Sequence, residues 1–227
     1  MKKTILLLIT ISILSCNLER HLDKITIEIN KISDLYQTEV TYKITKKIKF
    51  NVKQDMLLVK VTINDALKRK YNDKYYIPAS NIAYLLFKDL PEQKYDKYIV
   101  EFYEGHNKIM KKIYERKNLE KLMKKLSVFD KLNSLLKNRD YEKVYELFDK
   151  EHLNLSKKEF IDMFNQFNTI TDIKYEGFLY GKLTVKNKNI PYIASFETIC
   201  YKDGILPVYI IMDETKNKFI SFQNNWN

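Results

Sequence analysis

Three histidines and two cysteines are the residues of this 227-residue chain best suited to bind a metal or to take part in catalysis. His21, His106 and His152 fall in different predicted elements, and no two have the four-residue spacing of zinc ligands on one helix. The chain also lacks the HExxH, CxxC and GxSxG motifs and a glycine-rich phosphate-binding loop. We therefore predict no catalytic residue, no metal site and no cofactor, and we expect a protein that is not an enzyme.

Cys200 could pair with His152 as a thiol with its base, but the pattern around it favours a structural role. Ala194, Phe196 and Cys200 fall on one face of a predicted strand. Free cysteine is among the residue types most often buried. We interpret Cys200 as a buried core thiol.

Tyr180 and Glu197 are the polar residues that could line a cavity, if the predicted C-terminal strands enclose one. A carboxylate on a half-exposed strand more often faces solvent, so a solvated position is the alternative for Glu197. Both residues are candidates for a ligand site only.

Cys16 follows an apolar run at the start of the chain. Two lysines follow Met1, and residues 5–14 form a run of about ten residues, too short to span a bilayer. A positive start followed by such a run is typical of a signal peptide. The alternative is a buried N-terminal strand or helix.

The segment Ile13-Leu14-Ser15-Cys16 resembles the lipobox of bacterial lipoproteins, although Ile13 and Leu14 depart from its commonest pattern. The resemblance implies that residues 1–15 are a signal peptide, removed before a Cys16 that carries diacylglycerol and palmitate-type acyl chains. Each buried methylene contributes about 0.8 kcal/mol, so two or three chains give stable membrane attachment. Asn17, where aspartate would retain a lipoprotein at the inner membrane, implies the outer membrane, facing the periplasm or the cell surface.

The chain carries a net charge of +11, but only four of its 40 basic residues are arginine. Nucleic-acid-binding proteins rely on the planar guanidinium group of arginine, whereas lysine is a solvated point charge. We predict no nucleic-acid partner and interpret the charge as a solvated basic surface. Attraction to an anionic membrane surface is the alternative.

Residues 16–116 are predicted to form one α+β module in the order α-β-β-α-β-β. Residues 64–77 are expected to be irregular. In chain order, the expected elements are a helix over 18–36, strands over 40–52 and 57–63, a helix over 78–90, a strand over 98–103 and a strand or helix over 108–116.

Residues 117–227 are predicted to form helices packed on a four-stranded antiparallel meander. Ser156 and Glu159 form a capping-box pattern at the start of one helix. Short turns separate the alternating strands, which leaves only antiparallel neighbours. The helix that follows Ser156 carries an apolar stripe that must be buried: Phe160, Met163, Phe164 and Phe167.

This order of helices and strands over 117–227 resembles the cystatin-like cone fold, which nuclear-transport-factor-like domains share. The resemblance rests on element order and implies a cone-shaped domain. It implies no catalytic residue, because the enzymes of that fold place different residues in the cone.

These observations predict a lipid-anchored bacterial envelope protein with a non-enzymatic interaction or accessory role. Its expected partners are membrane lipid through Cys16 and an envelope protein. One alternative is a small-ligand binder or enzyme that uses a cavity in the C-terminal cone, and another is an immunity-type lipoprotein. A cone filled by Phe160, Phe164, Phe167 and Phe196 would favour the first reading, and a deep polar cavity the second.

Overall fold

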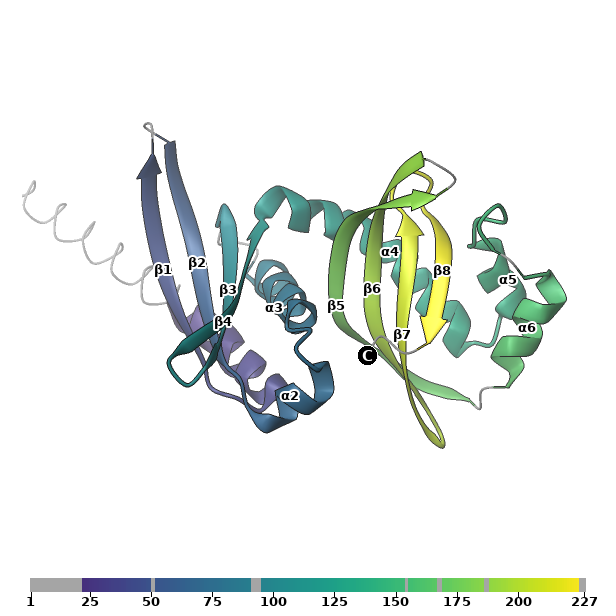
Figure 1. Cartoon of the computed structure of the whole chain (residues 1–227), viewed down its shortest axis with the longest axis horizontal. Helices are drawn as coiled ribbons and strands as arrows, with labels where there is room; N and C mark the ends of the chain where they lie inside the picture. The colour runs from purple at the N-terminus through teal and green to yellow at the C-terminus, as the bar shows by residue number, and fades with distance from the viewer. Residues whose placement is uncertain are drawn as a thin grey trace, which may run out of the picture. The chain divides into compact units, whose positions relative to one another are not determined.

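The computed structural model describes residues 22–224, apart from 50–51, 91–94, 154, 167–168 and 186–187 (Figure 1). The described chain divides into two compact units. The first contains 22–70 and 82–113, and the second contains 71–81 and 114–224. Each unit combines helices with a four-stranded sheet, which confirms the predicted α+β class.

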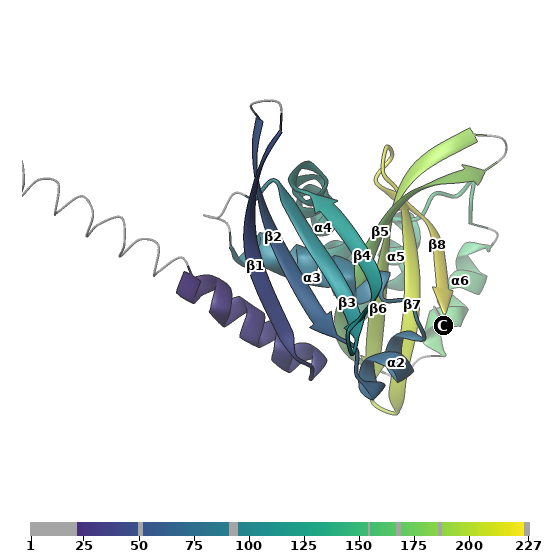
Figure 2. The same ribbon diagram turned by 60° about the vertical axis from the view of Figure 1, so that its left-hand side comes forward.

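The first unit is built around a mixed sheet (Figure 2). Its elements are a helix over 22–36, β1 (Val40–Lys49), β2 (Val52–Thr62), α2 (Asp65–Tyr71), β3 (Lys97–Glu104), β4 (Asn107–Glu115) and the part of α3 (Tyr76–Asp89) that follows residue 81. The strand order is β1-β2-β3-β4, with β1 and β2 antiparallel and β2 and β3 parallel. A parallel pair needs a crossover connection, and α2 and α3 lie within that connection.

The position of α2 corrects the sequence prediction, which expected residues 64–77 to be irregular. The Asn64 side-chain oxygen accepts a hydrogen bond of 2.9 Å from the backbone N–H of Leu67 and caps the helix. Asparagine is among the preferred N-cap residues. Residues 108–116, which fitted either a strand or a helix, belong mostly to β4. Gly105 supplies the positive φ of 56° in the turn before it.

Alternation on β2 and β3 places one apolar face of the first sheet in the core. The helix over 22–36 adds its predicted stripe, spaced by three and four residues. The buried residues are Leu57, Val59 and Val61 on β2, Tyr98, Val100 and Phe102 on β3, and Ile25, Ile29, Ile32 and Tyr36 on the helix.

The second unit contains the predicted antiparallel meander, with neighbouring strands in chain order. Its elements are α4 (Arg116–Lys137), α5 (Tyr141–Glu146), α6 (Lys157–Asn165), β5 (Ile170–Val185), β6 (Lys188–Tyr201), β7 (Gly204–Asp213) and β8 (Lys218–Asn224). The capping box is confirmed: Ser156 accepts from the Glu159 N–H at 3.3 Å, and Glu159 accepts from the Ser156 N–H at 2.8 Å.

Aromatic side chains fill the space between these helices and the sheet. Phe164 on α6 lies against Tyr141 on α5 and Phe222 on β8, with ring centroids 5.5 and 5.1 Å apart. Phe129 on α4 contacts Phe219 on β8 at 5.2 Å. Phe167, the last residue of the predicted stripe, lies outside the described residues. The fully buried rings of this cluster are Phe129, Phe148, Phe160, Phe164 and Phe219.

Both faces of the meander are covered, and this corrects the predicted face assignment. On β6, Glu197 lies on the face toward α4, so Phe196 and Cys200 lie on the opposite face. There Phe196 packs against Tyr76 and Tyr209, at centroid distances of 5.9 and 4.8 Å. Phe196 therefore does not join the aromatic cluster. Cys200 is partly exposed rather than a buried core thiol.

The segment 71–81 covers this second face through a close backbone contact at Gly177. A Cβ atom at Gly177 would lie 2.2 Å from the carbonyl oxygen of Ile77. The Ser80 hydroxyl accepts from the Phe178 N–H and donates to the Ile77 carbonyl, both at 2.7 Å. Only glycine allows this approach.

A buried carboxylate reinforces the same contact. The Tyr71 hydroxyl donates to Glu176 at 2.9 Å, and the Thr198 hydroxyl donates to its other oxygen at 3.0 Å. These bonds satisfy a carboxylate that would otherwise be costly to bury.

We expect Phe164→Ala to lower the free energy of unfolding by about 3–5 kcal/mol, because it removes a buried aromatic ring and leaves a cavity. Urea unfolding followed by circular dichroism measures the loss. Met123→Ala on α4, where the side chain is exposed, is the control and should cost less than about 1 kcal/mol. Equal losses in the two variants would contradict the packing described here.

We expect Gly177→Ala to destabilise the protein by about 1–3 kcal/mol or more, because the new methyl group overlaps the Ile77 carbonyl. Gly204→Ala is the matched control. Its Cβ would meet only the movable end of the Tyr201 side chain, at 3.2 Å, and it should cost less than about 1 kcal/mol. Thermal unfolding of both variants measures the difference. A Gly177→Ala protein as stable as the unsubstituted one would exclude the close contact.

Candidate functional site

The two residues predicted to line a cavity share one face of the meander but do not meet. Tyr180 pairs with Ile193 and Tyr175 pairs with Glu197, so both candidates lie on the face toward α4. Five residues of β5 separate these positions, about 16 Å along a strand. Tyr180 and Glu197 therefore do not form a joint site.

Tyr180 joins β5 to the beginning of α4. Its hydroxyl donates to the backbone carbonyl of Asn118 at 2.9 Å. Burial, with a smaller contribution from the nearby Glu214 carboxylate, raises the pKa of Tyr180, so the phenol is neutral. Glu214 itself forms an ion pair with Lys121 on α4. These contacts attach the first turns of α4 to the sheet.

Glu197 lies in the interior, not on the solvated strand face that was the alternative. Its side chain is 0% exposed. The hydroxyl of Ser195, also fully buried, donates to the Glu197 carboxyl at 2.7 Å. From α4, Asn133 and Asp130 lie close enough to affect its titration. The Tyr175 hydroxyl binds Asp130 at 2.8 Å, which extends the polar group to β5.

Burial raises the pKa of Glu197 to about 7, and the charge of Asp130 adds to this effect. Hydrogen bonding by Ser195 and Asn133 opposes it without cancelling it. A carboxyl group with such a pKa can exchange a proton near neutral pH, as general acid–base catalysis requires. Because the side chain is completely buried, a substrate could reach Glu197 only if the packing around it opened. Glu197 therefore serves as a titratable group within the core.

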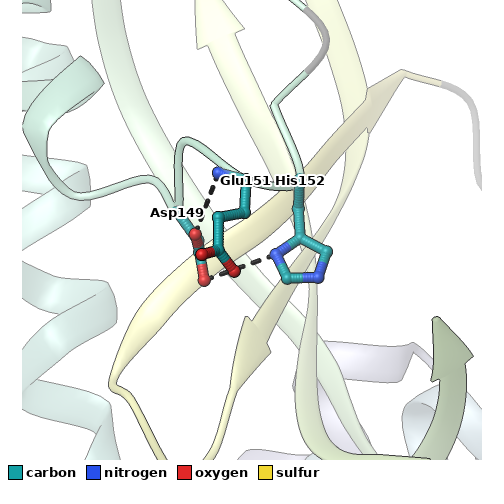
Figure 3. Close-up of side chains that lie close together, drawn as sticks. All are labelled: Asp149, Glu151 and His152. Carbon is teal, nitrogen blue, oxygen red and sulfur yellow. Dashed lines mark hydrogen bonds and ion pairs between the residues drawn. The ribbon is translucent and has the colours of Figure 1, made fainter. Parts of the chain in front are cut away.

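A second group of ionisable residues lies after α5, where Asp149, Glu151 and His152 come together (Figure 3). Their potential ligand atoms all lie within 4.8 Å of one another. The Asp149 carboxylate accepts from the Glu151 N–H at 3.1 Å and lies 3.3 Å from the His152 Nδ1. Sequence reasoning considered His152 only as a base for Cys200. The spacing of three ligand types within four residues was the signal for this cluster.

Lys216 determines what this cluster can hold. Two carboxylates and an imidazole are suitable donors for a divalent cation. However, the Lys216 ammonium group lies 2.7 Å from Asp149 and 3.6 Å from Glu151, so a positive charge already sits beside both carboxylates. A metal ion would have to displace it, and the donors therefore fit a metal poorly.

The charge state of Asp149 agrees with this ion pair. Burial alone would raise the pKa of Asp149, but hydrogen bonds from Lys216 and from the Glu151 backbone outweigh it and lower the pKa. The cluster thus connects the segment after α5 to the turn between β7 and β8 as a salt-bridge network.

The remaining candidates do not assemble into a site within the described residues. His106 is exposed in the turn between β3 and β4. No contact joins Cys200 to His152 in the described part of the chain, so the thiol–imidazole pair does not form there. His21 and Cys16 lie outside the described residues.

Comparison with known proteins identifies no relative. No family model matches the chain, and no curated protein or solved structure matches it at a significant level. Over the residues that the structure describes, no helix is both long and apolar enough to cross a membrane.

The raised pKa of Glu197 predicts a specific dependence of stability on pH. The folded state holds the proton more tightly than the unfolded state, whose pKa is near 4.5. Stability should therefore be highest below that pH and should fall by about 3 kcal/mol as pH rises through about 7. Glu197→Gln should remove this fall and make the protein more stable than the unsubstituted one at alkaline pH.

Urea unfolding across this pH range measures the effect. Asp149 has a lowered pKa and titrates below this window, so Asp149→Asn is a control that should leave the fall in place. An unchanged pH profile in Glu197→Gln would contradict the assignment.

Proposed function

We propose that the protein is a lipid-anchored bacterial envelope protein with a non-enzymatic interaction or accessory role. The observation that carries the proposal is the lipobox-like segment 13–16, which follows a short apolar run behind two lysines. Cleavage before Cys16 would leave a lipid-modified cysteine as the first residue. Asn17 favours the outer membrane, with the folded units on the periplasmic side or at the cell surface.

The packing of the second unit supports a binding protein rather than an enzyme. Of the four residues that the first reading placed in this space, Phe160 and Phe164 lie there with Phe129, Phe148 and Phe219, whereas Phe196 lies on the opposite face of the sheet and Phe167 is outside the described residues. Rings in mutual contact fill the part of this space beside β8, and the polar pair Ser195–Glu197 is buried against α4. A surface interaction is the function best compatible with this interior.

A small-ligand binder or enzyme of the cone type is the second candidate, and one observation favours it. Glu197 has a pKa of about 7 and lies between α4 and the sheet, where the cone fold would place a cavity. A ligand would have to open the contact between α4 and β6 to reach it. The proposal of an interaction protein needs no such opening.

Replacement of Cys16 tests the anchor. Cys16→Ser should abolish labelling by an alkyne analogue of palmitate and release the protein from the membrane fraction of the producing bacterium, because the thioether-linked lipid is lost. Cys200→Ser is the matched control, since Cys200 is the other cysteine of the chain, and it should keep full labelling. Membrane association and labelling that persist in Cys16→Ser would refute the proposed attachment.

A further inference from the structure

The hairpin of β1 and β2 extends beyond the rest of the first sheet (Figures 1 and 2). β3 pairs with β2 only from Met56 to Thr62. Asp55 still contacts the residue before β3, because the Asp96 N–H donates to its carbonyl and its own N–H donates to the Asp96 carboxylate, both at 2.8 Å. Lys46 lies opposite Asp55, and further along the hairpin Ile48 lies opposite Lys53. Among the described residues near this end, the side chains of Lys46, Lys47, Ile48 and Lys53 are exposed. We call Lys46, Lys47, Ile48 and Lys53 the basic tip.

The basic tip combines unneutralised positive charge with an exposed apolar side chain. Lys46, Lys47 and Lys53 are exposed, and none forms an ion pair with another described residue. Ile48 is 74% exposed, the highest value among the large apolar residues of the described chain. The segment 43–55 contains one acidic residue, Asp55, and its side chain is partly buried.

Four other lysines of the first unit have carboxylate partners, whereas Lys43, Lys60, Lys88, Lys97 and Lys112 form no ion pair among the described residues. Lys31 pairs with Glu28 at 2.7 Å, and Lys68 pairs with Glu104. Lys108 and Lys111 both pair with Glu101, which is buried. What distinguishes the basic tip is that its lysines lie beside the exposed side chain of Ile48 at the end of a protruding hairpin.

Lysines beside an exposed apolar residue suit an anionic lipid surface. Lysine ammonium groups are attracted to the negative surface potential, and an apolar side chain gains free energy by entering the headgroup region. Nucleic acid is a poorer match because the tip has no arginine. Docking of these lysines and Ile48 on a lipid surface requires no protein partner of complementary shape.

We propose that the basic tip docks on the anionic phospholipid surface of the membrane to which the protein is attached. This proposal rests on the attachment at Cys16, because attachment brings the first unit within reach of the surface. Six residues lead from Cys16 to Leu22, a span of at most about 22 Å. The Tyr42 hydroxyl lies 3.1 Å from Thr26, so β1 passes beside the start of the first helix. Ile48 lies six residues further along β1, about 20 Å away.

Vesicle co-sedimentation of the unlipidated chain from residue 17 onward, which contains every residue described in the structure, tests the tip without the anchor. Binding should be measurable to vesicles containing phosphatidylglycerol and absent from vesicles of phosphatidylcholine alone. The tip variant combines Lys46→Gln, Lys47→Gln and Lys53→Gln. Its partition into anionic vesicles should fall by about a hundredfold, since each lysine contributes about fivefold near such a surface.

A control variant of equal net charge separates the tip from general attraction. It combines Lys124→Gln, Lys131→Gln and Lys158→Gln, three exposed lysines of the second unit. Its partition should change by no more than about threefold, because these charges lie outside the docking surface. Equal losses in the two variants, or no binding by the unsubstituted chain, would overturn the proposal.

A fluorescence reporter gives a second readout. In a Trp226→Phe background, which removes the natural tryptophan, Ile48→Trp should shift its emission to the blue when anionic vesicles are added. Ile205→Trp, at an exposed isoleucine of the second unit, is the matched control and should show no shift. A shift at residue 205 alone would exclude docking through the tip.

The outcomes distinguish this proposal from the proposed function. Loss of labelling in Cys16→Ser concerns the anchor, whereas vesicle binding of the unlipidated chain concerns the tip. If the tip variant keeps its vesicle binding but loses binding to a polyglutamate peptide or to single-stranded DNA, the tip serves an acidic protein or a nucleic acid, and the lipid proposal is wrong.

Discussion

The close approach of the Ile77 carbonyl to Gly177 is the constraint on which the second unit depends. It allows the segment 71–81 to cover the face of the meander that the helices α4 to α6 leave open. A sheet buried on both faces must pair every polar side chain that it carries inward. Glu176 meets this requirement through Tyr71 and Thr198 on one face, whereas on the other face Ser195 pairs one oxygen of Glu197 and the second oxygen is buried without a hydrogen bond from another described residue.

Local patterns in the sequence were sufficient to predict most elements. The stripe over 22–36, the capping box at Ser156 and the short turns of the meander depend on neighbouring residues, so they could be read directly. Asn64 is a typical N-cap residue and indicates the start of helix α2. The helix was not predicted because the residues that follow Asn64 lack a regular apolar spacing. The alternation of residues on β6 identified which of them share a face. It could not show that the segment 71–81, about 120 residues earlier, covers the face with Phe196 and Cys200. For this reason Phe196 and Cys200 were assigned to the wrong environment.

The candidate site was less predictable because its contacts are distant in sequence. Glu197 was recognised as a possible functional residue, but its burial depends on α4, more than sixty residues earlier. Lys216 decides the character of the cluster around Asp149, and 67 positions separate the two residues. A single sequence gives no indication of such pairs. The basic tip could be seen as a run of lysines, yet its protrusion follows from the shorter pairing of β3.

Helix α3 belongs to both units, since residues 76–81 fall in the second and 82–89 in the first. A helix of six residues is not stable on its own, because forming the first turn is unfavourable and only further turns offset that cost. The chain also passes between the units at 70–71, 81–82 and 113–114. A single break at 113–114 would thus leave the 71–81 segment in place on the meander. The two fragments would stay together without a covalent bond, as the pieces of a split protein do.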